Sequence, residues 1–208
     1  MAKDGLAAQH KSDSSAIRSL YDEWAPSYEA DLAKWGYVAP TVAADLLASH
    51  ASTNAQIIDV GCGTGLVGSA LAAVGFHDVV GVDGSSVSLD MAAKTGNYRA
   101  LSEVELTALP SELPEDHFGG LVCVGVMTYL PDVAATCREL ARVVELDAPI
   151  VITQRTDLFE SRSTQAAFDE LAADDTWTII EVTEPMPYLP EHPEYQGIDV
   201  RYGVFRSN

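Results

Sequence analysis

Basic residues, cysteines and long apolar runs are all scarce in this sequence. Its 208 residues include 12 Lys plus Arg against 31 Asp plus Glu, which gives a formal net charge of −19. Nucleic acids and anionic membranes are bound through basic patches, so this charge argues against both as partners. No segment reaches the ~18 consecutive apolar residues of a membrane-spanning helix, and the first residues include no apolar signal region. We therefore expect a cytoplasmic protein.

The cysteines are odd in number and have no C-x-x-C spacing: Cys62, Cys123 and Cys137. Neither a disulfide framework nor a zinc site follows from them, and we expect no metal site. Cys62 lies among glycines and Cys123 within an apolar run, so both are expected to be small buried residues. With 47% apolar and 21% charged residues the composition is that of a globular protein, and the length predicts one domain over residues 1–208.

The most informative stretch is Q-I-I-D-V-G-C-G-T-G, residues 56–65. Apolar residues run into Asp59, and glycines follow at every second position: Gly61, Gly63 and Gly65. This pattern predicts a strand that ends in a tight turn and opens a helix over residues 66–72. Glycine is needed where φ is positive or where a ligand approaches the backbone. The N–H groups at the start of the helix would then face the ligand.

Two cofactor classes use such a turn. A dinucleotide fingerprint reads G-x-G-x-x-G, which Gly63 to Gly68 fits, and it needs an acid about 20 residues further on. Here, however, the glycines start directly after the strand and Asp59 precedes them. A carboxylate at that position would repel a pyrophosphate and attract a cationic group such as an amino-acid ammonium. A nicotinamide enzyme is therefore the less favoured alternative.

A second apolar strand, residues 79–83, also ends in an acid. Asp83 comes one strand–turn–helix unit after Asp59, where a carboxylate is well placed to accept both ribose hydroxyls. Each such charge-assisted bond is worth roughly 1.5–3 kcal/mol. The alternative role for Asp83 is to cap the next helix, for which Gly84, Ser85 and Ser86 compete. We favour the ribose role.

The string D-x-G-x-G-x-G at residues 59–65 strongly resembles motif I of the class I S-adenosylmethionine (SAM)-dependent methyltransferases. Residues 21–29, Y-D-E-W-A-P-S-Y-E, are similar to a segment that forms a lid over the methyl donor in many small-molecule members of that family. The strings Trp24-Ala25-Pro26 and Val82-Asp83-Gly84-Ser85 resemble the small vertebrate methyltransferase-like proteins within it. The resemblance spans roughly residues 17–155. It implies SAM as cofactor and S-adenosylhomocysteine (SAH) as product.

The alternation of strands and helices predicts an α/β fold with a doubly wound sheet. We expect a Rossmann-like, mostly parallel sheet of seven strands with one antiparallel strand near the C-terminus. Strands are predicted at residues 56–60, 79–83, 98–106, 118–126, 149–153, 176–183 and 198–205. Pro26 is expected to end a first helix that begins at Ser14 or Ser15, with a second helix over residues 28–35. Residues 1–50 would form a helical lid segment, 55–155 the cofactor-binding core, and 156–208 the last strands and an acceptor-side loop.

Ligands of such sheets bind beyond the carboxyl ends of the strands. The acid that usually reads the adenine amino group in this family has no match, and Thr107, Ala108 and Leu109 stand in its place. Tyr28 in the lid segment is expected to contact the cofactor, although Tyr21, Trp24 and Tyr28 are equally explained as core aromatics. The expected cofactor-binding residues are Tyr28, Asp59, Gly61, Cys62, Gly63, Gly65, Asp83, Gly84, Ser85, Thr107, Ala108, Leu109, Val124, Gly125 and Tyr129.

The resemblance implies in-line displacement at the sulfonium methyl by a nucleophile of a small-molecule acceptor. The donor is already activated, so the protein mainly aligns and desolvates the reactants, and a base is needed only if the acceptor loses a proton. Candidate bases are Tyr129, His192 and Glu194. Arg155 is a candidate to hold a substrate carboxylate, with an ion pair to one of the many acids as its alternative role.

The loop over residues 184–197 is long and aromatic, which suits either a wall of the acceptor pocket or a packed connector. An alternative function is a SAM-binding protein that transfers no methyl group. Such a protein would sense the cofactor or use its sulfonium charge for a cyclisation or an elimination. We expect a monomer or a homodimer that has a small-molecule methyl acceptor as its partner.

Overall fold

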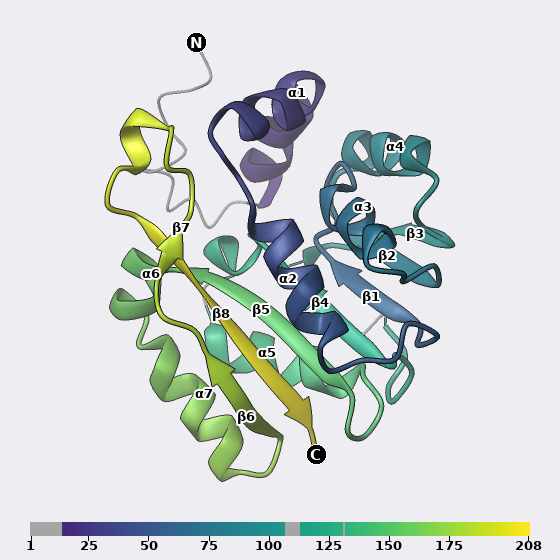
Figure 1. The fold of residues 1–208 in the computed structure, drawn as a ribbon, viewed down its shortest axis with the longest axis vertical. Helices are drawn as coiled ribbons and strands as arrows, with labels where there is room; N and C mark the ends of the chain where they lie inside the picture. The colour runs from purple at the N-terminus through teal and green to yellow at the C-terminus, as the bar shows by residue number, and fades with distance from the viewer. Residues whose placement is uncertain (1–13, 107–112, 131) are drawn as a thin grey trace.

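The computed structural model of the protein describes residues 14–106, 113–130 and 132–208 and has an eight-stranded sheet with helices on both faces (Figure 1). The strands are β1 (Ile57–Val60), β2 (Val79–Asp83), β3 (Ala100–Glu103), β4 (Gly120–Cys123), β5 (Pro149–Arg155), β6 (Trp177–Val182), β7 (Met186–Pro187) and β8 (Asp199–Ser207). The α-helices are α1 (Ser14–Lys34), α2 (Ala39–Ala48), α3 (Leu66–Ala73), α4 (Ser86–Thr95), α5 (Val133–Arg142), α6 (Thr156–Ser161) and α7 (Thr164–Ala173). Short 3₁₀ helices are η2 (Met127–Tyr129) and η3 (Pro193–Tyr195).

The strand order is β3-β2-β1-β4-β5-β8-β6. From β1 the chain first adds β2 and β3 on one side, and then crosses to the other side of β1 to add β4 and β5. The first five strands, β1 to β5, are parallel to one another, whereas β8 is antiparallel to both β5 and β6. The predicted doubly wound sheet with one antiparallel strand near the C-terminus is therefore confirmed. The two-residue strand β7 was not predicted; it pairs with the start of β8 on the edge that β6 uses further along.

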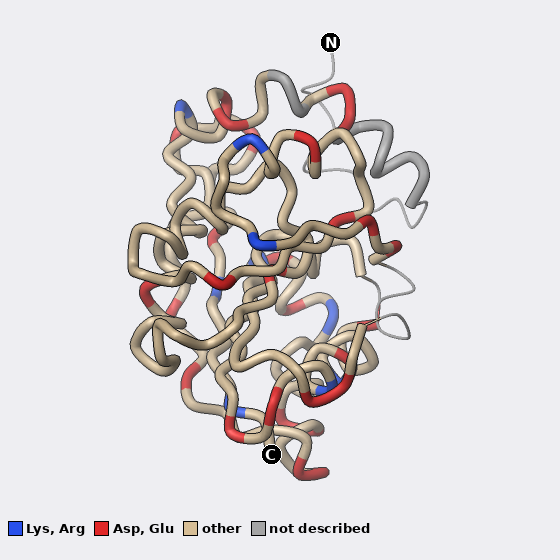
Figure 2. Tube along the Cα trace, turned by 90° about the vertical axis from the view of Figure 1, so that its right-hand side faces the viewer, with Lys and Arg blue, Asp and Glu red and all other residues tan. Residues whose placement is uncertain are grey.

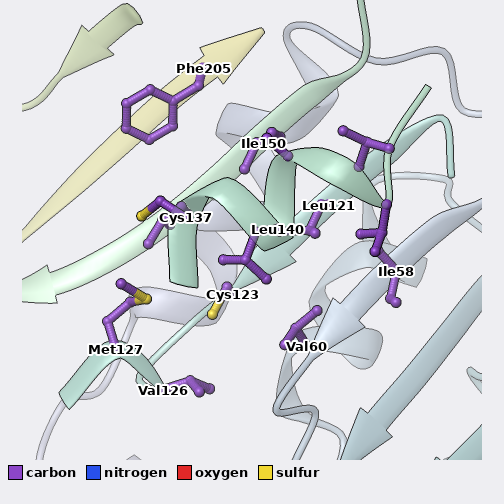
Figure 3. Close-up of a cluster of buried hydrophobic side chains, with 14 of the residues drawn as sticks. Ile58, Val60, Leu121, Cys123, Val126, Met127, Cys137, Leu140, Ile150 and Phe205 are labelled. Atoms are coloured by element: carbon purple, nitrogen blue, oxygen red, sulfur yellow. The ribbon is translucent and has the colours of Figure 1, made fainter. Parts of the chain in front are cut away.

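The central strands are buried on both faces, because successive side chains of a strand point to opposite sides. Ile57 packs with α2 and α3, while Ile58 packs with α5 and α7. In Figure 1, α2 lies in front of the sheet and α5 behind it. Figure 3 shows Cys137 and Leu140 of α5 in the same hydrophobic cluster as Ile58 of β1 and Leu121 of β4. The hydrophobic runs of the sequence thus become a sheet held between two helical layers.

We expected the N-terminal helix to end at Pro26, and this prediction is wrong. Helix α1 runs unbroken from Ser14 to Lys34. Proline lowers helix propensity by removing one N–H donor, but tertiary packing can override that preference. The second half of α1 supplies that packing. Trp24 and Leu32, with Trp35 just beyond the helix, are buried against Leu189 and Tyr195 of the loop before β8.

Two predicted strands are shorter than expected. In place of residues 98–106, β3 covers only Ala100–Glu103, an edge strand that buries little of its surface and so gains little from further pairing. In place of residues 118–126, β4 covers Gly120–Cys123, because Gly125 has φ +79° and turns the chain into η2. Both differences place loops, rather than strand, at the carboxyl end of the sheet.

The turn before β5 contains the sequence L-D-A-P, residues 146–149. Asp147 adopts φ +66°, which non-glycine residues seldom do and which Asp tolerates better than most. Its carbonyl accepts a hydrogen bond of 2.9 Å from Nη1 of Arg206 on β8. This turn precedes β5, so it lies at the amino end of the parallel strands, away from the glycine turn that follows β1.

One end of the sheet carries the loops that follow β1, β2, β4 and β5. In Figure 1 these ends point toward α1 and the loop between β7 and β8. The two covering segments are packed together: the Trp35 ring meets the His192 ring at 4.3 Å between centroids, and Trp24 meets Trp35 at 5.8 Å. The fold therefore brings residues far apart in sequence together at the carboxyl end of the strands.

The aromatic packing around Phe205 generates a stability prediction. Phe205 is fully buried, stacks on Trp177 at 3.9 Å between ring centroids and meets Phe168 edge-on at 4.8 Å. Phe205→Ala should lower the free energy of unfolding by ~3–5 kcal/mol, measured by urea denaturation. The control Leu146→Ala, at a residue that is 75% exposed, should change it by less than ~0.5 kcal/mol. Equal effects of the two substitutions would contradict this description of the core.

Candidate functional site

The turn after β1 has the backbone conformation that its glycines predicted. Gly61, Gly63 and Gly65 have φ angles of +75°, +52° and +101°. A Cβ on Gly61 would lie 2.1 Å from Cγ2 of Val126, so that position is closed by packing. A Cβ on Gly63 would meet no atom within 4 Å. Gly63 thus faces open space, which is the condition for a ligand to approach the backbone closely.

Asp83 connects the ends of β1 and β2. One carboxylate oxygen accepts a hydrogen bond from the N–H of Gly63 at 2.9 Å, and the other accepts one from the N–H of Ser85 at 2.8 Å. Ser85 is the residue that caps α4, because its hydroxyl accepts from the N–H of Ser88, so Asp83 does not have the capping role. The N–H of Gly84 also acts on this carboxylate, which has about four acceptor positions in all, so Asp83 remains able to bind a hydroxyl group.

Burial raises the pKa of Asp83, while the N–H groups of Ser85 and Gly63 act in the opposite direction. The nearby carboxylate of Asp22 adds to the increase. Asp22 belongs to α1 and accepts a hydrogen bond of 2.5 Å from the Ser85 hydroxyl. This bond ties the N-terminal helix directly to the turn after β2.

Asp59 is enclosed on β1, with none of its surface exposed. Its Oδ2 accepts a hydrogen bond of 2.7 Å from the Tyr98 hydroxyl, whereas its Oδ1 has no partner among the residues the structure describes. Burial raises the pKa of Asp59 to about 7; the Tyr98 bond lowers it and the charge of Asp83 raises it further. Asp59 therefore lies beneath the turn, and its charge is incompletely compensated.

The segment after β4 is held by two residues that the sequence did not single out. The N–H of Gly125 donates to Oγ1 of Thr153 on β5 at 2.8 Å. The guanidinium of Arg162 donates to three carbonyl groups in and just after η2, those of Met127 and Leu130 at 2.9 Å and Thr128 at 3.0 Å. No sequence spacing signals Arg162, because it lies more than thirty residues after the carbonyls it binds.

Several tyrosines from different elements approach one another next to this segment: Tyr28, Tyr37, Tyr129, Tyr188 and Tyr195. The rings of Tyr37 and Tyr188 lie 5.5 Å apart between centroids, and those of Tyr188 and Tyr195 lie 5.7 Å apart. Burial is the main cause that raises the pKa values of Tyr28, Tyr37, Tyr188 and Tyr195, that of Tyr195 to about 12. Tyr28 packs edge-on against buried Trp24, so the lid segment also contributes core aromatics.

Two of the candidate catalytic residues are already engaged by protein groups. Nε and Nη2 of Arg155 donate to the two oxygens of Asp157, at 3.1 and 2.6 Å, and the guanidinium lies 5.2 Å from the centre of the Tyr195 ring. Nδ1 of His192 accepts from the N–H of Glu194 at 3.1 Å. Both side chains are buried, and their observed contacts stabilise the loop before β8.

Other expected site residues are distributed as follows. Thr107, Ala108 and Leu109 lie outside the described residues. Cys62 is buried in the turn, and burial raises the pKa of its thiol far above the usual value, so it is a neutral small side chain. Gly84 and Val124 lie at the carboxyl ends of β2 and β4.

The surface charge follows the composition. Figure 2 shows acidic positions over the whole outside of the trace, whereas Lys and Arg positions are few and scattered. In the described part of the chain, no helix combines the length and apolar character needed to cross a membrane. Nor do the described residues contain a group of three or more His, Cys, Asp or Glu arranged to hold a metal ion.

Comparison with known proteins identifies relatives over most of the chain. Residues 58–152 match the model of a methyltransferase domain. The human protein named methyltransferase-like protein 27 is 34% identical over 166 residues, which is 76% of this chain and 66% of the relative. The chain thus spans just under two thirds of that relative's length.

Solved structures share the fold across nearly the whole chain. A TehB-like SAM-dependent methyltransferase from Corynebacterium glutamicum aligns with a TM-score of 0.64 and 22% identity, covering 90% of this chain and 98% of that one. The [4+2]-cyclase SpnF aligns with a TM-score of 0.67 and 14% identity, covering 92% and 94% of the two chains. At these identities the likeness concerns the fold alone.

The buried charge of Asp59 is incompletely compensated, so replacing this residue by Asn is predicted to have opposite effects on stability and on ligand binding. The folded chain keeps the Asp59 proton up to about pH 7, whereas the ordinary value is 3.8. Asp59 therefore contributes stability at low pH that is lost as the pH rises from about 4 to about 7. Asp59→Asn, which carries no charge, should stabilise the ligand-free protein at pH 8 by about 2–4 kcal/mol in urea denaturation.

The same substitution should weaken SAH binding roughly 10- to 100-fold in calorimetry, since the neutral amide gives no charge attraction to the ligand's ammonium group. Thr153→Val is a matched control, because it removes a buried polar group elsewhere at the same end of the sheet. It should destabilise the protein instead. An Asp59→Asn protein that is less stable at pH 8 would contradict the assignment.

Proposed function

Because the chain belongs to the SAM-dependent methyltransferase family, we propose that it transfers the methyl group of SAM to a small-molecule acceptor by in-line displacement. One observation carries this proposal. The turn after β1 leaves open space at Gly63, whose N–H binds half-buried Asp83, and it follows buried Asp59, one oxygen of which has no partner among the described residues. A nucleoside with a cationic amino-acid part supplies the charge and the hydroxyl groups that such a turn lacks.

The residues fit the parts of SAM in order along the sheet. We assign the ribose hydroxyls to Asp83, whose carboxylate retains acceptor capacity beside its backbone hydrogen bonds. We assign close backbone approach to Gly63 and attraction of the ammonium group to Asp59, which acts from beneath the turn because its own surface is enclosed. The remaining expected residues, Tyr28, Gly61, Cys62, Gly65, Gly84, Ser85, Val124, Gly125 and Tyr129, would shape the walls of the site.

Bound SAM supplies a methyl group on a sulfonium, which is already activated for attack. The chain's own contribution is then alignment and exclusion of water. Arg162 fixes the backbone of η2, which carries Tyr129, while α1 and the loop before β8 cover the carboxyl end of the strands. The tyrosines on that side offer rings and neutral hydroxyls, which suit a small organic acceptor better than a macromolecule.

The hydroxyls of Tyr28 and Tyr188 are poor bases at neutral pH because burial raises their pKa values. His192 and Arg155 are held in the loop packing described above. We therefore expect an acceptor that is nucleophilic at neutral pH without help from the protein.

The second candidate function is SAM binding without methyl transfer, for sensing, cyclisation or elimination. The engagement of His192 and Arg155 by protein groups favours it, and one protein of similar fold, SpnF, is a [4+2]-cyclase. Incubation with SAM labelled in its methyl group and a panel of small thiols, amines and phenols separates the two functions. Labelled product supports methyl transfer, whereas tight SAM binding with no product supports the second candidate.

We also propose the remaining organisation. Residues 1–50 act as a lid segment, 55–155 as the cofactor-binding core and 156–208 as the acceptor side. The protein would work in the cytoplasm as a monomer or a homodimer. Size-exclusion chromatography with light scattering tests the oligomeric state.

Gly63→Val tests the cofactor site. The structure leaves open space for the side chain in the ligand-free protein, so the cost to folding is confined to the strain of a β-branched residue at φ +52°. We expect the variant to fold, as seen by circular dichroism, and to lose SAH affinity by at least ~100-fold in calorimetry because the side chain fills the ligand's place. Retained affinity in a folded variant would contradict the site, and absence of SAH binding by the wild type would contradict the function.

Arg162→Gln tests the positioning of η2. The variant loses the hydrogen bonds to three carbonyl groups on either side of Tyr129, those of Met127, Thr128 and Leu130. We expect kcat for methyl transfer to fall ~10- to 100-fold while SAH affinity changes less than ~3-fold, because misplacement by about 1 Å affects alignment more than binding. Arg138→Gln, which removes an exposed ion pair with Asp174, is the control and should change neither quantity.

A further inference from the structure

Tyr98 lies outside every motif of the sequence and outside strand β3, yet its ring packs against Gly68 and Gly81 and its hydroxyl binds Asp59. A Cβ on Gly68 of α3 would lie 2.3 Å from Cζ of Tyr98, and a Cβ on Gly81 of β2 would lie 2.9 Å from its Cδ1. The ring therefore fits a slot that exists only because both positions are glycine. The slot lies directly under the glycine turn, between α3 and the strands.

The Tyr98 hydroxyl makes two hydrogen bonds of opposite sense. It donates to Oδ2 of Asp59 at 2.7 Å and accepts from the N–H of Gly68 at 2.9 Å. The N-cap of α3 is Gly65, which has no side chain to satisfy the N–H groups of the first turn. Tyr98 supplies that cap from another part of the chain and links the positive end of the helix to the carboxylate.

The other ionisable groups near Asp59 do not stabilise its charge. Asp83 on β2 opposes it, and the thiols of Cys62 in the turn and Cys123 on β4 are neutral, since burial raises their pKa values far above the usual range. Among the described residues that influence Asp59, Tyr98 is the one whose contact lowers the carboxyl pKa.

We infer that Tyr98 is a positioning residue for cofactor binding: its hydroxyl holds the Asp59 carboxylate in the orientation and the ionised form that attract the ammonium group of SAM. This inference rests on the proposed function, because it assigns Asp59 to that group. Tyr98 itself touches neither the ligand nor the reacting atoms. It acts by coupling the affinity of the site to the protonation of one enclosed carboxyl group.

The coupling predicts how binding depends on pH. Wild-type affinity for SAH should rise between pH 6 and 8, as Asp59 loses its proton with a pKa of about 7. Tyr98→Phe keeps the ring in its slot and removes only the hydroxyl. Loss of a hydrogen bond to a charged group raises the midpoint by roughly 1–2 pH units and weakens binding at pH 7 by about 5- to 50-fold.

The experiment is calorimetry with SAH from pH 6 to 8.5, together with 5′-methylthioadenosine, which has the nucleoside but no ammonium group. Tyr98→Phe should displace the SAH curve to higher pH and leave methylthioadenosine binding independent of pH. Tyr202→Phe is the matched control, because Tyr202 is buried and its hydroxyl has no partner in the part of the chain that the structure describes. It should leave both curves unchanged.

A second variant moves the same quantity in the opposite direction. Fluorotyrosine at position 98 keeps the ring and has a more acidic hydroxyl, so it donates more strongly and should lower the midpoint. Titration of the Asp59 carboxyl carbon by NMR, in the ligand-free protein, should show the same two displacements. The NMR titration measures the protonation of Asp59 without ligand binding or turnover.

The outcomes separate the two proposals. If wild-type protein binds SAH but Tyr98→Phe leaves the midpoint unchanged, or weakens binding by the same factor at every pH, the role of Tyr98 is overturned and the proposed function stands. If wild-type protein binds no SAH at any pH, the proposed function fails. Displacements of opposite sign in the two variants support the positioning role.

Discussion

The Asp59 carboxylate is enclosed by protein, but in the described part of the chain only one of its two oxygens has a hydrogen-bond partner, and the proposed site is built on this incomplete compensation. Burial of a charged group is unfavourable unless the charge is compensated, so the ligand-free chain tolerates a strained electrostatic state at the end of β1. In the function we propose, the ammonium group of the ligand would relieve that state. Free energy lost in folding around Asp59 would then be recovered on binding, as is common where function and stability compete.

The rest of the carboxyl end of the sheet is organised around that turn. Asp83 joins the ends of β1 and β2, Asp22 ties α1 to the next turn, and Arg162 fixes the backbone after β4. The aromatic contacts between Trp35 and His192 join the two segments that cover this end. Carboxylates and backbone groups, which we propose to bind the cofactor, therefore lie at the same end of the sheet as the tyrosine rings, which we propose to line the acceptor pocket.

The fold could be predicted largely from local patterns. Apolar runs that end in Asp59 and Asp83 identified the first two strands, and the positive φ angles of the glycines were confirmed. Predictions failed where packing overrides local preference. Helix α1 passes Pro26 because its second half is held by aromatic contacts, and β4 ends early at Gly125. The cap of α4 was left open among neighbouring residues and proved to be Ser85, a choice set by side-chain direction.

The order of residues along the chain determined the glycine turn, the two acids and the alternation of strands and helices, because each of these is a local pattern with its own spacing. Only the tertiary structure decided that Tyr98 bonds to Asp59, that Arg162 holds η2 and that Arg155 is engaged by Asp157 near Tyr195. Most of these contacts join residues some thirty or more positions apart, and no spacing encodes them. Even the Arg155 pair, which is local, acquires its buried setting from the loop before β8.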